Sequence, residues 1–265
     1  MKSKDSRSLP RYPGGNEAGE AFSHYAADRS LTVVTETASG MYVGSSVCIR
    51  IDGRLFVATA RHCIEPAVGY RLLPRGEIGH AGLQPIAASH PRSAPWPHDV
   101  AWLEIDPLSP GIGRLRALEL SDLLVGQIHQ PEQVFAVQGF PAEEVEDVAS
   151  GALAPRSITL GTISLPPTDS RLVVEWPPSS AEDAGLQLVN PHGVSGGGVW
   201  RYPAFSDSLI WLPEASKLVG LAAAWLDSRC ALYCEPIQNW LSLVATDHPG
   251  LKQAIATVSR FRTDA

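Results

Sequence analysis

Short segments in which apolar and polar residues alternate, or in which β-branched residues gather, recur along most of the chain. They cover residues 31–37, 42–51, 55–60, 100–105, 133–140, 157–164, 171–175, 198–201, 217–224 and 231–236. Pairs rich in Gly, Pro and Asp follow nearly every one of them. A period of two residues between such breakers is typical of strands. With about ten short strands and no helical period between them, the pattern predicts an antiparallel all-β domain, either a sandwich or a barrel.

The two ends of the chain differ from this pattern. Four apolar residues recur with helical spacing near the C-terminus: Ile237, Trp240, Leu241 and Val244. We therefore expect a C-terminal helix over 236–246 that packs one face on the β-core. Residues 1–28 begin basic and polar and lack the apolar stretch of a secretory signal. They are interpreted as a flexible N-terminal leader with a short helix over 17–28.

Composition narrows the possible functions. The chain has 265 residues, 44% of them hydrophobic and 18% charged, which suffices for one large domain or two small ones. The strand pattern loosens over 118–133, so we expect one domain over 29–125 and a second over 126–265. The net charge of −7 argues against a nucleic-acid partner. No apolar run approaches the roughly 20 residues of a membrane-spanning helix, which argues against a membrane protein. The missing signal predicts a cytoplasmic location.

The four cysteines do not pair convincingly in the sequence. Asp52 and Gly53 form the tip of a predicted hairpin, which places Cys48 opposite Val57 and far from Cys63. Cys230 and Cys234 are separated by three residues, and His62 is adjacent to Cys63. Neither spacing forms a convincing half of a zinc site. We expect buried free thiols and no metal or other cofactor.

Three polar residues at the ends of predicted strands supply the groups of a nucleophilic hydrolase. His62 follows one such strand, Asp99 precedes another, and Ser195 lies among glycines before a third. A serine hydroxyl needs a base to take its proton, and the base needs a group that fixes its tautomer. The glycines let the backbone turn tightly enough to point N–H groups at an oxyanion. We therefore predict that His62, Asp99 and Ser195 form a catalytic triad.

The segments that carry these residues resemble the motifs of trypsin-like (chymotrypsin-fold) serine peptidases, in the bacterial HtrA-type branch. The matches are Thr59-Ala60-Arg61-His62-Cys63, Asp99-Val100-Ala101-Trp102-Leu103 and Gly193-Val194-Ser195-Gly196-Gly197, with a weaker one at Gly44-Ser45-Ser46-Val47. The resemblance covers most of the chain and implies two six-stranded antiparallel β-barrels with a C-terminal helix. It implies peptide-bond hydrolysis through an acyl-enzyme, with His62 as base, Asp99 as orienting carboxylate and Ser195 as nucleophile. The N–H groups of Gly193 and Ser195 would form the oxyanion hole.

The resemblance also implies a substrate pocket. Its residues would be Val189 at the floor, Ala223, Ala224 and Trp225 in the walls, and Ala231 at the back. None is acidic, so we expect a small or medium apolar P1 side chain rather than Arg or Lys. His192 lies three residues before Ser195, and we expect it to line the substrate cleft. The partner is then a protein or peptide substrate.

The chain departs from the family in its means of activation. Val194 stands where many secreted members carry an Asp that pairs with a new N-terminus, so we expect no activation of that kind. Either the oxyanion loop is preformed, or a ligand or regulatory partner protein orders it. The usual disulfide partner of Cys63 is missing from its place, which agrees with a cytoplasmic location, and we expect no PDZ domain after the protease segment.

Two alternatives remain. Residues 193–197 also satisfy the G-x-S-x-G elbow of α/β-hydrolase esterases. That fold needs its Asp and His after the Ser, and only the adjacent Asp247 and His248 follow Ser195 as such a pair. The second alternative is a pseudoprotease that keeps the fold and uses its surface for binding.

Overall fold

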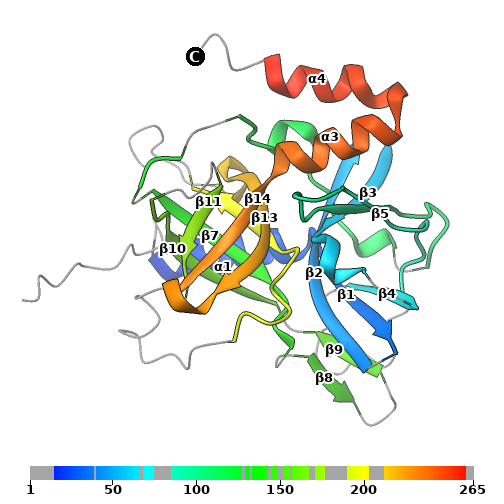
Figure 1. The fold of residues 1–265 in the computed structure, drawn as a ribbon, viewed down its shortest axis with the longest axis horizontal. Helices are drawn as coiled ribbons and strands as arrows, with labels where there is room; N and C mark the ends of the chain where they lie inside the picture. The colour runs from blue at the N-terminus through cyan, green and yellow to red at the C-terminus, as the bar shows by residue number, and fades with distance from the viewer. Residues whose placement is uncertain are drawn as a thin grey trace, which may run out of the picture.

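The computed structural model describes residues 15–38, 40–65, 68–74, 85–110, 112–126, 129–131, 133–142, 145–148, 152–155, 157–166, 171–176, 190–202 and 212–260. Two six-stranded antiparallel sheets form the body of the protein. In Figure 1 the first sheet lies on the right and the second on the left, with α3 and α4 together at the top.

The first sheet has the strand order β4-β1-β2-β3-β6-β5. Its strands are β1 (Ser30–Thr37), β2 (Gly40–Ile51), β3 (Arg54–Thr59), β4 (Gly69–Pro74), β5 (Arg92–Ser93) and β6 (Ala101–Glu104). Asp52 and Gly53 form the tip between β2 and β3, and both have positive φ, 50° and 79°. This turn fixes the register that the sequence predicted, with Cys48 opposite Val57.

The second sheet has the order β10-β7-β12-β13-β14-β11. Its strands are β7 (Val134–Gly139), β10 (Ile158–Ile163), β11 (Leu172–Glu175), β12 (Gly198–Arg201), β13 (Lys217–Leu226) and β14 (Ala231–Pro236). A bridge between Ser164 and Val174 links the two edge strands. A separate hairpin consists of β8 (Val145–Val148) and β9 (Ala152–Pro155). All ten predicted strands are present, and the all-β fold class is confirmed.

Three α-helices are described: α1 (Gly15–Ala27), α3 (Ile237–Asp247) and α4 (Lys252–Arg260). The helix α3 is the predicted C-terminal helix, and its four periodic apolar residues are all buried. Short 3₁₀ helices occur at η1 (Arg61–Cys63), η2 (Ile112–Arg114), η3 (Leu120–Asp122), η6 (Pro213–Ala215), η7 (Asp227–Arg229) and η8 (Pro249–Leu251). No helix among the described residues combines the length and apolar character needed to cross a lipid bilayer.

The N-terminal segment differs from the expected flexible leader over 15–27, because α1 packs into the core. Phe22 and Ala26 are fully buried, and Tyr25 is 7% exposed. Their spacing of three and four residues places them on one helix face. The ring of Phe22 packs on Trp200 and Tyr202 of the second half. Residues 1–14 of the predicted leader lie outside the described residues.

A single apolar cluster runs through both halves of the molecule. It joins Phe56 of the first sheet, Trp200 and Leu221 of the second, and Trp240 of α3. The strands of the first sheet all precede residue 126, and those of the second all follow it. Because one apolar core packs against both sheets, the sheets cannot move independently, and loops from both sheets lie along the boundary between them.

Candidate active site

His62 and Asp99 come from neighbouring strands of the first sheet. His62 lies in η1, just after β3, and Asp99 lies just before β6, which pairs with β3. His62 Nδ1 is 2.6 Å from Asp99 Oδ2, and the backbone N–H of His62 donates to Asp99 Oδ1 at 3.1 Å. Both carboxylate oxygens thus contact the same residue. This contact orients the ring and leaves Nε2 for a second partner.

The contact between His62 and Asp99 shifts the pKa of both side chains. The hydrogen bond with Asp99 raises the pKa of His62 above its ordinary value, and the contact with Cys63 adds to the rise. Burial alone would raise the pKa of Asp99, but its hydrogen bond with His62 and the nearby positive charges outweigh burial and lower it. Asp99 is therefore ionised at neutral pH and stabilises the protonated imidazole.

Ser195 enters the same cleft from the second half of the molecule. It lies in the loop before β12, and its hydroxyl donates to the carbonyl oxygen of Ala223 at 3.4 Å. Within the described residues the hydroxyl makes no hydrogen bond to His62, whose Nε2 lies 3.9 Å from Cys63 Sγ. Hydrogen bonds of this type are often long in the absence of substrate and shorten in the reacting complex.

The cleft has a volume of about 660 Å³ and takes residues from both halves. It is lined by Thr35, Thr37, Tyr42, His62, Glu65, Asp99, Pro191, His192, Ser195, Ala223, Ala224 and Trp225. The three predicted triad residues therefore meet on one surface, although they are far apart in sequence. A cleft of this volume can hold several side chains of a bound peptide and is much larger than the site of a single ion.

The loop before β12 presents two backbone N–H groups beside Ser195. Gly193 has φ of +93°, and a Cβ there would lie 2.5 Å from the nitrogen of Ala142. The carbonyl of His192 accepts from that nitrogen at 2.8 Å. Because N–H and C=O of a trans peptide point in opposite directions, the N–H of Gly193 is turned away from Ala142. Within the described part of the chain, neither this N–H nor that of Ser195 donates to a protein acceptor.

The predicted pocket residues are only partly brought together. Ala223, Ala224, Trp225 and His192 line the cleft. Ala231 is fully buried in β14, paired with Glu175 and Leu226, and does not line the described cleft. Its side chain is held in the interior by the strand on either side. Val189 lies outside the described residues.

Sequence reasoning missed Glu235, a charged residue behind Asp99. Its side chain is 2% exposed. One carboxylate oxygen accepts the backbone N–H of Asp99 at 3.2 Å, and the other accepts from Asn239 Nδ2 at 2.9 Å. His98 Nδ1 lies 3.6 Å from the same carboxylate. The signal in the sequence was a single acidic residue in an otherwise apolar strand, directly before the C-terminal helix.

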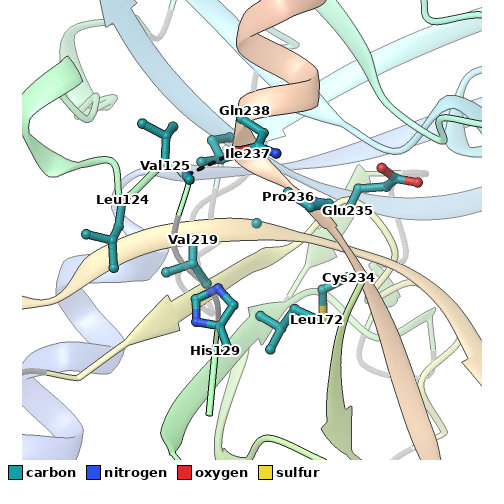
Figure 2. A pocket seen from close by; sticks show the side chains of 12 residues that line it. Leu124, Val125, His129, Leu172, Val219, Cys234, Glu235, Pro236, Ile237 and Gln238 are labelled. Carbon is teal, nitrogen blue, oxygen red and sulfur yellow. Dashed lines mark hydrogen bonds between the residues drawn. The ribbon is translucent and has the colours of Figure 1, made fainter. Parts of the chain in front are cut away.

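Glu235 also borders a second cavity, of about 230 Å³, between the second sheet and the segment 124–126. Figure 2 shows its carboxylate extending away from His129, Leu172 and Val219, which line that cavity. Cys234 lies there too, and burial raises the pKa of its thiol. A thiol kept protonated is a poor nucleophile. The Cys234 thiol is therefore a poor nucleophile.

All four cysteines are free, as predicted. Cys48, Cys63 and Cys234 are buried, but Cys230 is exposed, which differs from the expectation. Cys230 ends the tight turn η7 with φ of 47°, and this turn lies at the surface. Beside Cys63 stands Gly44, where an added Cβ would lie 2.7 Å from Sγ. No group of three or more metal-binding side chains occurs among the described residues.

Comparisons with known proteins agree with the fold. No protein-family model and no curated protein sequence matches the chain. The solved structures do match: a thermostable serine protease, AL20, from an extremophilic microorganism has a TM-score of 0.55 at 15% identity, over 79% of this chain and 91% of that one. A serine endoprotease from Yersinia pestis gives 0.56 at 13% identity, over 84% of this chain and 64% of its own.

A third match is the protease Anisep from Arthrobacter nicotinovorans, with a TM-score of 0.53 at 14% identity over 80% of this chain and 93% of that one. At such identities a structural likeness establishes the fold and leaves the activity to be argued from the site. The paired six-stranded sheets and these matches together establish that the chain has the chymotrypsin-like fold.

Proposed function

We propose that this protein is a serine endopeptidase that hydrolyses peptide bonds through an acyl-enzyme intermediate. The observation that carries the proposal is the cleft shared by Ser195 and the hydrogen-bonded pair His62–Asp99. Two N–H groups without protein acceptors in the described chain lie on the loop of the nucleophile. The chemistry of acyl transfer needs these same four elements: a nucleophile, a base, an orienting acid and an oxyanion hole.

The reaction begins when the Ser195 oxygen attacks the scissile carbonyl carbon and His62 Nε2 takes the hydroxyl proton. Asp99 stabilises the imidazolium that forms. The carbonyl oxygen becomes an oxyanion, and the N–H groups of Gly193 and Ser195 donate to it. His62 then gives its proton to the leaving amine, which departs and leaves an ester on Ser195. Water, activated by the same imidazole, hydrolyses that ester and restores the hydroxyl.

The substrate is a protein or peptide. Tyr42 of β2 and Trp225 of β13 expose 57% and 40% of their surface at the cleft, one from each half of the molecule. Such aromatic surfaces suit the side chains of an extended peptide. The small walls at Ala223 and Ala224 favour a small or medium apolar P1 residue. A P1-scanning peptide library tests this preference, and a clear choice of Arg or Lys overturns it.

Labelling with a fluorophosphonate probe tests the proposed nucleophile directly, because the probe reacts only with an activated serine. The wild-type protein is expected to bind one probe molecule and to cleave an unstructured protein such as casein. Ser195→Ala is expected to lose both activities, with a loss of about 10⁶-fold in turnover. Ser242→Ala is the matched control, since the hydroxyl of Ser242 is exposed and bonds only within α3. A labelled Ser195→Ala protein contradicts the proposal.

One contact favours a second candidate, a binding protein or a peptidase that a partner must activate. The hydroxyl of Ser195 bonds to Ala223 rather than to His62. A wild-type protein that stays inert to the probe supports this alternative over the peptidase. Recovery of labelling on addition of a protein fraction then separates partner activation from a pure binding role.

A further inference from the structure

Ser45 of β2 makes contacts that join the two halves of the cleft. Its side chain is fully buried. The hydroxyl donates to the carbonyl oxygen of Gly193 at 2.6 Å and accepts the backbone N–H of Phe140 at 2.7 Å. Gly193 and Phe140 belong to the second half of the molecule, whereas Ser45 belongs to the first sheet. One hydroxyl thus ties the strand β2 to both segments that shape the nucleophile loop.

The backbone of Ser45 adds a third tie. Its N–H donates to the carbonyl oxygen of Ser195 at 2.7 Å, and its own carbonyl accepts from Thr59 Oγ1 at 2.7 Å. A Cβ on Gly196 would lie 2.1 Å from the Ser45 oxygen, so the loop packs directly on this residue. Ser45 therefore fixes the peptide between Gly193 and Val194 and the peptide between Ser195 and Gly196.

These ties determine the direction of the Gly193 N–H. A glycine has wide conformational freedom, so its φ and ψ are set by the two peptide planes that flank it. The plane before Gly193 is held by Ala142, through the carbonyl of His192. The plane after Gly193 is held by the Ser45 hydroxyl. The same hydroxyl also binds Phe140, two residues from Ala142, so it couples both planes.

Val194 makes such a device necessary in this chain. A valine side chain cannot accept a hydrogen bond or form an ion pair. The side chain of Val194 is 1% exposed and packs in the apolar core of the second half. In the described part of the chain, the loop is held by hydrogen bonds to its backbone and by close packing around its glycines.

We propose that Ser45 is the positioning residue of the oxyanion loop: its hydroxyl fixes the carbonyl of Gly193 and so keeps the N–H of Gly193 facing the cleft before any substrate or partner binds. This inference rests on the proposed peptidase function and deepens it. It assigns the loop a preformed state. Ser45 does not touch the reacting atoms and acts through Gly193.

The test compares Ser45→Ala with Ser46→Ala, which is a closely matched control. Ser46 is also fully buried in β2, and its hydroxyl also donates to one backbone carbonyl, that of Leu31, at 2.9 Å. Ser45→Ala loses two buried hydrogen bonds and Ser46→Ala loses one, so Ser45→Ala should melt at the lower temperature, and kinetics are measured below both melting transitions. Loss of oxyanion stabilisation costs about 100-fold in kcat with little change in KM, so Ser45→Ala is expected to show this loss. Ser46→Ala is expected to keep kcat close to that of the wild type.

A peptide boronic acid provides a second readout, because its tetrahedral adduct places an oxygen in the oxyanion hole. Ser45→Ala is expected to bind it about 100-fold more weakly, in proportion to the loss in kcat. If Ser45→Ala does not fold, Ser45→Thr and Ser45→Val form a nearly isosteric pair of which only Thr keeps the hydroxyl. We expect kcat to be about 100-fold higher for Thr than for Val.

The outcomes separate this inference from the proposed function. A wild-type protein that reacts with the fluorophosphonate, together with equal kcat values for Ser45→Ala and Ser46→Ala, overturns the role of Ser45 alone. A loss confined to KM, or equal in both variants, overturns it as well. A wild-type protein inert to the probe overturns the peptidase function itself.

Discussion

The two halves of the candidate site are held in place by different means. The His62–Asp99 pair is fixed by side-chain hydrogen bonds between neighbouring strands of one sheet. The loop of Ser195 is fixed by hydrogen bonds to its backbone, including those from the side chain and the N–H of Ser45, and by glycines with positive φ. The first half therefore depends on the identity of two side chains. The second half depends on the segments that pack around a glycine-rich loop and hold its backbone.

We expect the largest loss of kcat when the His62–Asp99 pair of the first half is changed. Asp99→Asn keeps the shape but removes the charge and the tautomer control over His62, so kcat should fall about 10⁴-fold. Steady-state kinetics on a peptide ester and a thermal melt measure the change. Asp106→Asn is the control, because Asp106 is exposed, its Oδ1 accepts the backbone N–H of Leu108 in a surface turn, and it does not line the cleft. A loss below tenfold in Asp99→Asn would mean that the pair does not act as base and orienter.

A smaller effect is expected from the second half. In Gly193→Ala, the added Cβ meets the nitrogen of Ala142 and the oxygen of Phe140 at 2.5 and 2.6 Å. The peptide must rotate, one oxyanion donor is lost, and kcat should fall about 10² to 10³-fold. Gly53→Ala tests the cost of positive φ alone, since nothing lies within 4 Å of a Cβ there. Equal kcat values for the two variants contradict the assigned role of Gly193.

The pH dependence of kcat/KM distinguishes the two halves, because it reports the pKa of His62 in the first half and not the geometry of the Ser195 loop. Asp99 favours the charged form of His62, so the pKa of His62 is raised and its neutral, basic form appears at higher pH. We expect kcat/KM to rise about tenfold per pH unit on the acidic side and to level off above a pKa higher than 6.5. In Asp99→Asn this limb should move to lower pH, whereas in Ser45→Ala it should stay in place. A profile flat from about pH 5 to 8 contradicts the base.

We expect the smallest loss of activity from changes at Glu235, whose carboxylate accepts the backbone N–H of Asp99. Glu235→Gln keeps an oxygen that can accept the Asp99 N–H, so activity should change less than tenfold. Glu235→Leu removes the acceptor and leaves a buried N–H without a partner, which costs about 1–3 kcal/mol of stability. A chemical-denaturation curve and kcat/KM of both variants measure the difference. Identical stability of the Gln and Leu variants would show that Glu235 does not hold the Asp99 backbone.

The sequence predicted those parts of the molecule whose cause is local. Alternation gave the ten strands, and the Asp52-Gly53 turn gave the register of β2 and β3. Residues 69–74 and 92–93 did not stand out, since β4 and β5 are short or lie at the edges of the sheet. The helix α1 was expected only as part of a leader, because the basic, polar segment before it obscured the burial of Phe22.

The parts of the site that could not be predicted depend on contacts between distant segments. Ser45 and Gly193 are 148 residues apart, and the motif match at Gly44-Ser45-Ser46-Val47 does not indicate which segment the Ser45 hydroxyl contacts. Glu235 meets Asp99 across 136 residues, and the distance in sequence again hides the contact. Hydrophobic periodicity reports which face of a strand is buried, but it carries no information on which loop lies against that face.

The apolar core that joins Phe56, Trp200 and Trp240 has a mechanical consequence. A hinge between the two sheets would have to expose these aromatic rings to water, at a cost of about 2 kcal/mol or more for each ring. We therefore expect the protein to melt in a single cooperative transition, and its two sheets to fail to complement each other as separate polypeptides. Substrates must then enter a groove whose walls do not swing apart.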